Sequence, residues 1–456
     1  MNINAIFAGK KFISSTKTEV KDLKNQIVAE MDNVPSVLVY QIRRNLLKTE
    51  SQGRSVIAKC LKKATNIFLN EEVDGVTCTE YVKLVHTVTG LPLKSVYKNV
   101  LQLVKEIDSL PSDITEEVPK GAHMLEDVNN LRDGNIYWIP KGRILSVIAP
   151  GNNPLVHRSW LEALAAGYKI LLRPSQKDPF TPYRLIKSLL MAGLSEDMVA
   201  FLPGTHNIVN AIVDAGDFSL VFGNKATIDR YNNLKNMILR GPGYSRLYWD
   251  DSATLSYEKC AQIIYNSVID DGGAKCTNIS GIIYDSANKY HMEAAIERIA
   301  KVDYCGWLDE QGELPLFPTS VAVKFVDYIK QLTSSKLVDS DLFQLNHAII
   351  DLGNGISSIK PIVFRISDFT KEFFDYELPF PTCWVYELKN KINVNLLKNT
   401  LLLKLLSTDK NLVYNCMIEP TIKKVITNHD SFDLIKGNKP HDGFLLQRLF
   451  FAKSII

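Results

Sequence analysis

Short apolar runs alternate with amphipathic segments between residues 143 and 243, and this alternation constrains the fold more than any other feature of the chain. A short apolar run is typical of a buried strand, whereas apolar residues at helical spacing predict a helix. We expect strands at 143–149, 169–173, 199–202, 218–222 and 237–239, and helices at 160–166, 183–191, 208–214 and 227–235. This order predicts an α/β fold in which right-handed crossovers join the strands of a parallel sheet.

The loops that follow these strands indicate where a ligand binds. Ligands of open parallel sheets bind outside the carboxyl ends of the strands, and the loops at that edge contain Pro150, Arg173, Gly204, Gly223 and Gly241. The sequence has neither GxGxxG after the first strand nor GxxxxGK[ST], so a standard Rossmann fingerprint and a P-loop are both disfavoured.

The turn at residues 223–227 is the candidate for holding cofactor phosphates. It contains Gly223 and Asn224 and leads into a predicted helix. Backbone N–H groups at the start of a helix attract anions. An ordinary strand–helix turn is the alternative.

A second informative stretch is Asp-Asp-Gly-Gly-Ala-Lys-Cys-Thr-Asn at 270–278, between a predicted helix at 257–268 and a predicted strand at 279–284. The two glycines before Cys276 allow a sharp bend and leave room for a ligand. A thiol on such a loop is a candidate nucleophile. We expect Lys275 to favour the thiolate, which is the reactive form. A buried structural cysteine is the alternative.

Composition excludes several classes of protein. The 456 residues are 46% hydrophobic and 23% charged, which suits a globular chain of two or three domains. A net charge of +3 argues against nucleic acid or a membrane surface as the main partner. The seven cysteines are scattered, so neither a disulfide framework nor a metal site is indicated. Without an apolar run long enough for a membrane span or a signal-peptide pattern, we expect a cytoplasmic enzyme.

The chain divides into four predicted segments. We expect an N-terminal helical region at 1–134, a nucleotide-binding α/β domain at 135–250, a catalytic α/β domain at 251–430, and a C-terminal return segment at 431–456 that is a candidate for oligomerisation. The N-terminal helices are predicted at 21–31, 37–47, 55–69 and 93–107. In the catalytic part we expect helices at 291–301 and 394–406 and strands at 347–352, 362–366 and 384–386. Residues 447–452 are either strand or helix.

Taken in order, several loops resemble those of the aldehyde dehydrogenase superfamily, and most closely its acyl-CoA reductase branch, typified by the LuxC fatty-acyl reductase. The resemblance covers about residues 135–456. Its motifs are Pro-Lys-Gly-Arg at 140–143, Gly-Asn-Asn-Pro at 151–154, Pro-Phe-Thr at 179–181, Gly-Pro at 241–242, the Cys276 loop, Glu-Leu-Pro-Phe-Pro at 377–381, His-Asp-Gly at 441–443 and Gln-Arg-Leu at 447–449. The superfamily form of the sixth motif is Glu-x-Phe-Gly-Pro, so its glycine is missing here.

The resemblance implies an aldehyde-dehydrogenase-like fold and a role for each matching residue. Cys276 matches the nucleophile, and Asn152 matches the side-chain donor of an oxyanion hole whose other donor is the Cys276 backbone N–H. Glu377 matches the carboxylate that holds the nicotinamide ribose. The expected cofactor contacts are Arg173, Ser175, Lys177, Gly204, Gly223, Asn224, Glu377 and Phe380.

Two departures from the superfamily pattern refine this expectation. Hydrolytic members carry a glutamate near the Gly241 position to activate water, but residues 239–243 here are Leu-Arg-Gly-Pro-Gly, so water attack on an acyl-cysteine should be slow. Arg173 replaces a lysine, and Ser175-Gln176 stand where NAD-preferring members often have an acid. A 2′-phosphate is therefore tolerated, and Arg173 or Lys177 can bind it.

We therefore expect NADPH-dependent reduction of an acyl thioester, a fatty acyl group on CoA or on acyl-carrier protein, to an aldehyde through an acyl-cysteine. The alternatives are a hydrolytic NAD(P)-dependent aldehyde dehydrogenase and a catalytically inactive homologue that serves as a subunit of a complex. The resemblance also implies a homo-oligomer and an acyltransferase or acyl-protein synthetase as partner, without nucleic acid.

Overall fold

The alternating region forms the parallel sheet that the sequence predicts. The structure is a computed structural model that describes residues 1–8, 10–126, 128–333, 338–339, 345–369, 375–427 and 442–456. Five neighbouring strands run parallel in the order β12-β11-β8-β9-β10. They are β8 (Ile144–Ile148), β9 (Lys169–Arg173), β10 (Val199–Phe201), β11 (Phe218–Phe222) and β12 (Met237–Arg240).

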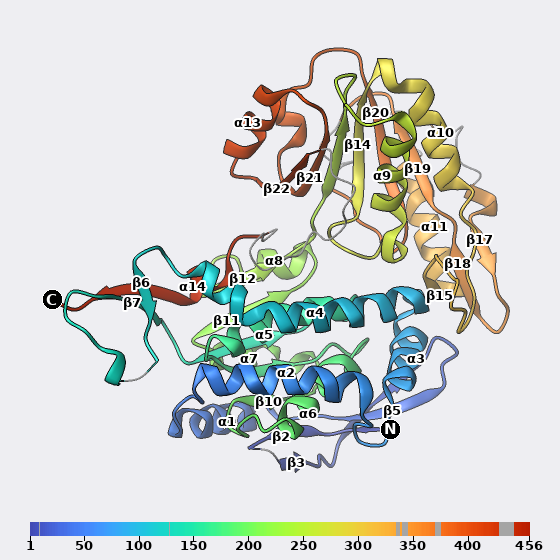
Figure 1. The fold of residues 1–456 in the computed structure, drawn as a ribbon. Helices are drawn as coiled ribbons and strands as arrows, with labels where there is room; N and C mark the ends of the chain where they lie inside the picture. The colour runs from blue at the N-terminus through green and yellow to red at the C-terminus, as the bar shows by residue number, and fades with distance from the viewer. Residues whose placement is uncertain (9, 127, 334–337, 340–344, 370–374, 428–441) are drawn as a thin grey trace.

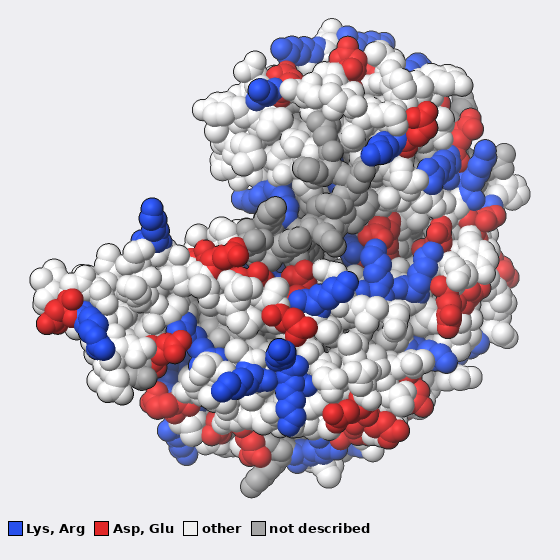
Figure 2. Space-filling view, in the orientation of Figure 1, with Lys and Arg blue, Asp and Glu red and all other residues white. Residues whose placement is uncertain are grey.

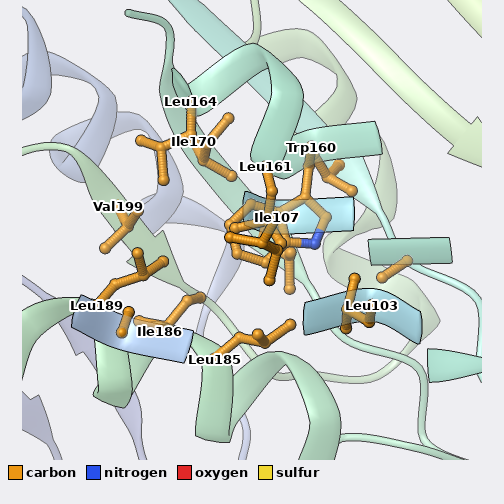
Figure 3. Packing of buried hydrophobic residues seen from close by; sticks show 14 of the residues in the cluster. Leu103, Ile107, Trp160, Leu161, Leu164, Ile170, Leu185, Ile186, Leu189 and Val199 are labelled. Atoms are coloured by element: carbon orange, nitrogen blue, oxygen red, sulfur yellow. The ribbon is translucent and has the colours of Figure 1, made fainter. Parts of the chain in front are cut away.

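Helices cover this sheet and bury its strands. The predicted crossover helices are α5 (Arg158–Ala165), α6 (Phe180–Met191), α7 (Val209–Ala215) and α8 (Lys225–Tyr231). Every residue of β8 and β9 is buried, which explains why these strands are continuous apolar runs rather than alternating ones. Figure 3 shows Ile170 and Val199 of the sheet beside apolar side chains of α5, α6 and the long helix α4 (Leu93–Glu117).

The strand order places a topological switch point between β8 and β11. From β8 the chain continues through β9 and β10 on one side, and it then returns to form β11 and β12 on the other side. Ligands of doubly wound sheets bind where the connections diverge in this way. The loops that begin at residues 149 and 223 are therefore in the position expected for a binding crevice.

The N-terminal region contains strands as well as helices. Helices α1 (Ser36–Lys48), α2 (Arg54–Asn70) and α4 confirm the predictions at 37–47, 55–69 and 93–107, whereas α3 (Cys78–Thr89) was not predicted. Strands β1 (Asn2–Ile3), β2 (Ala5–Phe7) and β3 (Lys10–Phe12) were not predicted either. Strand β2 pairs antiparallel with β10 and, together with β3, extends the first sheet to seven strands.

The helix predicted at 21–31 is wrong. Strands β4 (Lys17–Lys21) and β5 (Ile27–Asp32) form an antiparallel hairpin there. Asn25 has a φ of 63°, and the Asp22 side chain accepts hydrogen bonds from the backbone N–H groups of residues 24 and 26, so a turn interrupts any helix. Ala29 and Met31 are buried on either side of the exposed Glu30, which is strand periodicity.

The second half of the chain forms another seven-stranded sheet, in the upper lobe of Figure 1. Its order is β16-β19-β20-β14-β13-β21-β22, and all neighbours are parallel except β16 and β19. The strands are β13 (Ser245–Trp249), β14 (Ile279–Asp285), β16 (Val338–Asp339), β19 (Ile362–Ile366), β20 (Thr382–Leu388), β21 (Thr400–Leu406) and β22 (Ile422–Thr427). The helices are α9 (Tyr257–Ile269), α10 (Lys289–Ala300), α11 (Thr319–Thr333) and α13 (Lys410–Ile418).

The predictions for this half are mostly confirmed, with one error. The helix predicted at 394–406 is wrong, because a short 3-10 turn (Val394–Leu397) precedes β21. Strand β21 is an interior strand whose residues are almost all buried, so its run of leucines has no polar positions to show a period of two. A small sheet of β15 (Leu316–Pro318), β18 (Ile356–Ile359) and β17 (Ile349–Asp351) accompanies it.

The end of the chain returns to the start of the first α/β unit. Helix α14 (Leu445–Leu449) is followed by strand β23 (Phe450–Ser454), so residues 447–452 contain both types of structure. Strand β23 pairs antiparallel with β7 (Ile136–Pro140), which pairs in parallel with β6 (Ala122–Met124). These three strands extend away from both lobes in Figure 1.

The charged surface is mixed. On the face shown in Figure 2, lysine and arginine side chains are interspersed with aspartate and glutamate. Among the helices that the structure describes, none is both long and apolar enough to cross a bilayer.

Candidate active site

A cavity of about 1570 Å³ joins the carboxyl edge of the first sheet to the Cys276 loop. It brings together residues that are far apart in the sequence. The predicted site residues that line it are Asn152, Arg173, Ser175, Lys177, Gly223, Asn224, Cys276 and Glu377. Gly204 and Phe380, which were also predicted to contact the cofactor, do not line this cavity.

The conformation of the Cys276 loop is fixed by the side-chain hydrogen bonds of Asn278 and by the backbone at Gly273. Asn278 donates from Nδ2 to the carbonyl oxygens of Ser267 (3.2 Å) and Asp270 (3.0 Å), and its Oδ1 accepts from the Lys275 N–H (2.8 Å). Gly273 has a φ of 71°, and a Cβ there would lie 2.5 Å from the backbone nitrogen of Pro381. The glycine before the cysteine is therefore required by both backbone conformation and space.

The Cys276 thiol is partly exposed at the cavity wall. Burial, helped by the carboxyls of Glu377 and Asp442, raises the pKa of the thiol to about 12. The charge of Lys275 lowers the pKa of the thiol, as expected, but burial and the two carboxyls outweigh it, and its ammonium forms ion pairs with Asp270 (3.5 Å) and Asp271. These pairs leave the lysine little influence on the thiol.

The Gly-Pro-Gly turn at 241–243 packs directly on the Cys276 loop. The Cys276 carbonyl oxygen accepts a hydrogen bond from Ser245 Oγ (2.8 Å). A Cβ at Gly243 would lie only 1.9 Å from the same oxygen. Only glycine at position 243 allows the turn to approach the Cys276 backbone this closely.

Asn152, in the loop after β8, contacts the Cys276 loop. Its Nδ2 donates a long hydrogen bond (3.4 Å) to the carbonyl oxygen of Ala274, two residues before the cysteine. The loop after β8 is shaped by Asn153, whose Oδ1 accepts from the Leu155 N–H (2.8 Å), and by Gly151, whose Cβ would lie 2.5 Å from Ser175 Oγ. An amide donor and a thiol thus face one cavity, which is the arrangement that the predicted oxyanion hole requires.

Glu377 lines the same cavity and is hydrogen-bonded to the residue that follows the glycine turn. Its carboxyl accepts the N–H of Tyr244 (2.5 Å), and burial raises its pKa to about 7. Phe380, in the same motif, packs on Phe317 and Phe325 with ring centroids 6.3 and 5.8 Å apart. The aromatic residue therefore anchors the glutamate loop in the core instead of lining the cavity.

The region around the switch point has donors that fit the phosphates of a dinucleotide. Arg173 is buried, its Nη2 donates to the Gly204 carbonyl (3.0 Å), and its Nε has no hydrogen-bond partner among the described residues. Lys177 and Ser175 line the cavity beside it, where Ser175 Oγ accepts the Lys177 N–H (3.1 Å). A buried guanidinium with an unused donor suits an anionic group.

Asn224 caps the helix that follows β11. Its Oδ1 accepts the N–H of Thr227 (3.0 Å), and a Cβ at Gly223 would lie 2.5 Å from the Thr227 side chain. Glycine at position 223 therefore lets the turn pack closely against Thr227.

Several residues of the site were missed by sequence reasoning. Arg240 donates from Nη1 to the carboxylate and the carbonyl oxygen (3.0 Å) of Asp442, which joins the glycine turn to the C-terminal segment. Just before and at the start of β13, the Tyr244 N–H donates to the Glu377 carboxyl and Ser245 Oγ donates to the Cys276 carbonyl oxygen. No local sequence pattern identifies these two residues as part of the site. Glu162 could have been identified from the sequence, because it is a charged residue within the apolar run Trp-Leu-Glu-Ala-Leu-Ala-Ala. His441 lies outside the described residues.

Known proteins were compared with the chain by sequence. The family model described as "Aldehyde dehydrogenase family" matches residues 58–357. Malonate-semialdehyde dehydrogenase 2 of Bacillus mycoides (strain KBAB4) is 23% identical over 219 residues, which are 47% of this chain and 44% of that protein. A "probable methylmalonate-semialdehyde/malonate-semialdehyde dehydrogenase [acylating], mitochondrial" of Caenorhabditis elegans is 31% identical over 123 residues, 26% of this chain and 22% of that protein. The chain matches less than half the length of these curated relatives.

Solved structures resemble the whole fold. The aldehyde dehydrogenase KauB from Pseudomonas aeruginosa has a TM-score of 0.79 at 15% identity and covers 99% of this chain and 95% of its own. An indole-3-acetaldehyde dehydrogenase in complex with NAD+ has a TM-score of 0.80 at 14% identity, with the same coverage of both chains. These matches confirm the predicted aldehyde-dehydrogenase-like fold, and with the family match they show that the chain belongs to the aldehyde dehydrogenase family.

Proposed function

We propose that this chain is an NAD(P)-dependent oxidoreductase of the acylating type, which reduces an acyl thioester to an aldehyde through an acyl-Cys276 intermediate. Family membership supports NAD(P)-dependent chemistry on aldehydes. The observation that carries the reductive assignment is Arg240. It stands at the turn where hydrolytic members of the family have their glutamate base, and its guanidinium is paired with Asp442.

In the first step the acyl group moves from the carrier thiol to Cys276. Its sulfur attacks the thioester carbonyl, Asn152 Nδ2 and the Cys276 N–H donate to the developing oxyanion, and the carbon–sulfur bond to the carrier breaks. The proton of the Cys276 thiol ends on the departing carrier thiol. A thiol whose pKa is about 12 holds this proton until attack, so proton transfer accompanies bond formation.

In the second step the acyl-Cys276 carbonyl is reduced. NADPH, when bound, supplies the hydride. The same two donors hold the resulting alkoxide, whose collapse breaks the bond to Cys276 and releases the aldehyde. The sulfur then regains a proton from solvent.

Arg173 and Lys177 are proposed to bind the 2′-phosphate that distinguishes NADPH from NADH. Both residues line the cavity, and Ser175 stands at the position where an acid would repel this phosphate. Gly223, Asn224 and Glu377 are proposed to contact the rest of the cofactor, the last through its ribose hydroxyls.

The proposed substrate is an acyl group carried on a thiol. The word "acylating" in the name of one relative supports a thiol carrier, and CoA or acyl-carrier protein is the natural choice. A fatty acyl group, a homo-oligomer, and an acyltransferase or acyl-protein synthetase partner are proposed only from the motif resemblance to the LuxC branch.

A second candidate is the hydrolytic oxidation of an aldehyde to an acid. It is favoured by Glu377, a half-buried carboxyl whose pKa of about 7 is suitable for a general base and whose charge acts on Cys276. The names of several relatives, which are semialdehyde dehydrogenases, agree with this direction.

The test is oxidation of NADPH in the presence of a panel of acyl-CoAs, with the aldehyde identified by mass spectrometry. The proposal expects aldehyde and free CoA in equal amounts. Consumption of aldehyde with release of free acid, and no thioester reduction, would support the second candidate instead.

A further inference from the structure

One arginine on α5 is surrounded by four carboxyl groups. Arg158 donates from Nε to Glu106 (3.1 Å), from Nη2 to Asp113 (2.8 Å) and from Nη1 to Glu162 (2.5 Å). The fourth carboxyl is that of Glu117, which acts on both Arg158 and Glu162. Every nitrogen of the guanidinium is used, so this single positive charge is shared among more acids than it can balance.

The four acids differ in where they lie. Glu106 and Asp113 do not line the cavity, but Glu117 and Glu162 do. Glu117 is 6% exposed and Glu162 is 4% exposed. Glu117 Oε2 and Glu162 Oε1 are buried and accept no hydrogen bond from another described residue, although the two carboxyls can share a proton with each other. The cavity wall therefore contains two neighbouring carboxyl groups, each with one buried oxygen that has no donor other than a proton shared within the pair.

Two neighbouring buried carboxyls are unstable as a pair of anions. Burial and mutual repulsion raise the pKa of Glu117, and burial raises that of Glu162. A buried acceptor without a donor costs free energy. The pair is therefore completed by a shared proton or by a cation. Within the described residues no group of three or more His, Cys, Asp or Glu side chains can hold a metal ion.

The carboxyl pair is close to the reaction centre. Glu162 lies near enough to Arg240 for their charges to interact. Arg240 is hydrogen-bonded to Asp442, whose charge in turn acts on the Cys276 thiol. Arg240 does not serve as the missing donor for the pair, because Glu117 Oε2 and Glu162 Oε1 accept no hydrogen bond from another described residue.

We propose that Glu117 and Glu162 bind an ammonium group carried by the acyl chain of the substrate. The inference rests on the proposed reaction at Cys276 and narrows its substrate to an amino-acyl thioester or the matching amino-aldehyde. An ammonium group has three N–H donors and a positive charge, so it can satisfy both unused oxygens and offset their repulsion. A methyl group in its place would leave the two oxygens without donors, which is how such a site rejects the wrong substrate.

The experiment compares substrates of similar length that end in different groups. Aminohexanoyl-CoA, heptanoyl-CoA and adipoyl-CoA present an ammonium, a methyl and a carboxylate. The wild type should prefer the ammonium over the methyl substrate by at least about tenfold in kcat/KM. Glu117→Gln should remove this preference. Glu106→Gln is the matched control, because it also removes one carboxylate from Arg158 but lies outside the cavity wall.

A binding measurement separates this inference from the proposed reaction. Hexylamine should protect Cys276 of the wild type from alkylation by iodoacetamide better than hexanol does, and this readout needs no turnover. If thioesters are not reduced but aminohexanal is oxidised in preference to heptanal, the ammonium site stands and the direction of the reaction is wrong.

Three outcomes would overturn the ammonium site. One is a wild type that neither prefers the ammonium substrate nor is protected by hexylamine, a result that does not depend on any variant folding. Another is equal loss of the preference in Glu106→Gln, and the last is an unchanged preference in folded Glu117→Gln.

Discussion

Replacing Gly243 by alanine should disable the nucleophile without touching it. The new Cβ would lie 1.9 Å from the Cys276 carbonyl oxygen, whereas contacts under 3.0 Å are essentially never observed for a real Cβ. The turn and the cysteine loop must therefore separate by about 1 Å. A displacement of about 1 Å at reacting groups typically costs about 100-fold in rate, which is equivalent to about 2.7 kcal/mol in the activation free energy.

The assay is kcat/KM for acyl-CoA reduction, together with the rate at which acyl label is trapped on Cys276. Both should fall by about 100-fold in Gly243→Ala, while overpacking should cost about 1–3 kcal/mol in the free energy of unfolding. Gly53→Ala is the control, because nothing lies within 4 Å of its Cβ and its backbone is not strained. If folded Gly243→Ala reacts within twofold of Gly53→Ala, the contact between the turn and the Cys276 backbone does not position the thiol.

Three further predictions concern the nucleophile, its acidity and the cofactor. Cys276→Ala should abolish acyl-enzyme formation and turnover but retain NADPH binding, measured by fluorescence titration. Normal turnover of this variant would show that another thiol is the nucleophile. The pKa of the Cys276 thiol is raised from about 9 to about 12, so its protonated form persists at high pH. The alkylation rate of the free enzyme should therefore keep rising beyond about pH 9. A plateau of this rate near pH 9 would contradict the argument that burial raises the pKa. Arg173→Ala should raise KM for NADPH more than for NADH, and a wild type that uses both cofactors equally well would show that the 2′-phosphate is not recognised.

The parallel sheet could be predicted from the sequence because burial marks its strands. Strand β8 is buried at every residue and is bounded by a loop rich in glycine and proline, so length and flanking residues suffice to identify it. The leucine-rich run at 400–406 is just as buried but is bounded by no such signal on its N-terminal side. Its apolar residues fit a helix equally well, and pairing with strands β13 and β22 decides the outcome.

The hairpin at 17–32 was missed for a different reason. A turn centred on Asn25 lies inside the predicted helix, and an asparagine that adopts a positive φ is not distinguishable in sequence from one on a helix surface. The two short strands on either side each have too few residues for their alternation to stand out.

The candidate site was predictable where its chemistry is local. The glycines before Cys276 predict a sharp bend. The positive φ of Gly273 and the lack of space for a Cβ there confirm this prediction. Contacts across the chain were not predictable. The glycine turn meets the cysteine loop through Gly243 and Ser245, and Glu117 meets Glu162 only because α4 crosses α5. Lys275 acts in the predicted direction, but burial and the carboxyls of Glu377 and Asp442 outweigh its effect, and the aspartates at the start of the same loop pair with its charge.

The lifetime of the acyl-Cys276 intermediate tests the central claim most directly. Residues 239–243 offer no base, and Arg240 is engaged with Asp442, so hydrolysis should lack the general-base assistance that is typically worth about 100- to 10,000-fold. Acyl-enzyme prepared from acyl-CoA and freed of excess substrate should persist for minutes or longer. Addition of NADPH should then convert it to aldehyde, and addition of free CoA should recover acyl-CoA. Release of free acid at a rate comparable to aldehyde formation would contradict the account and would make Glu377 the first residue to test as a base.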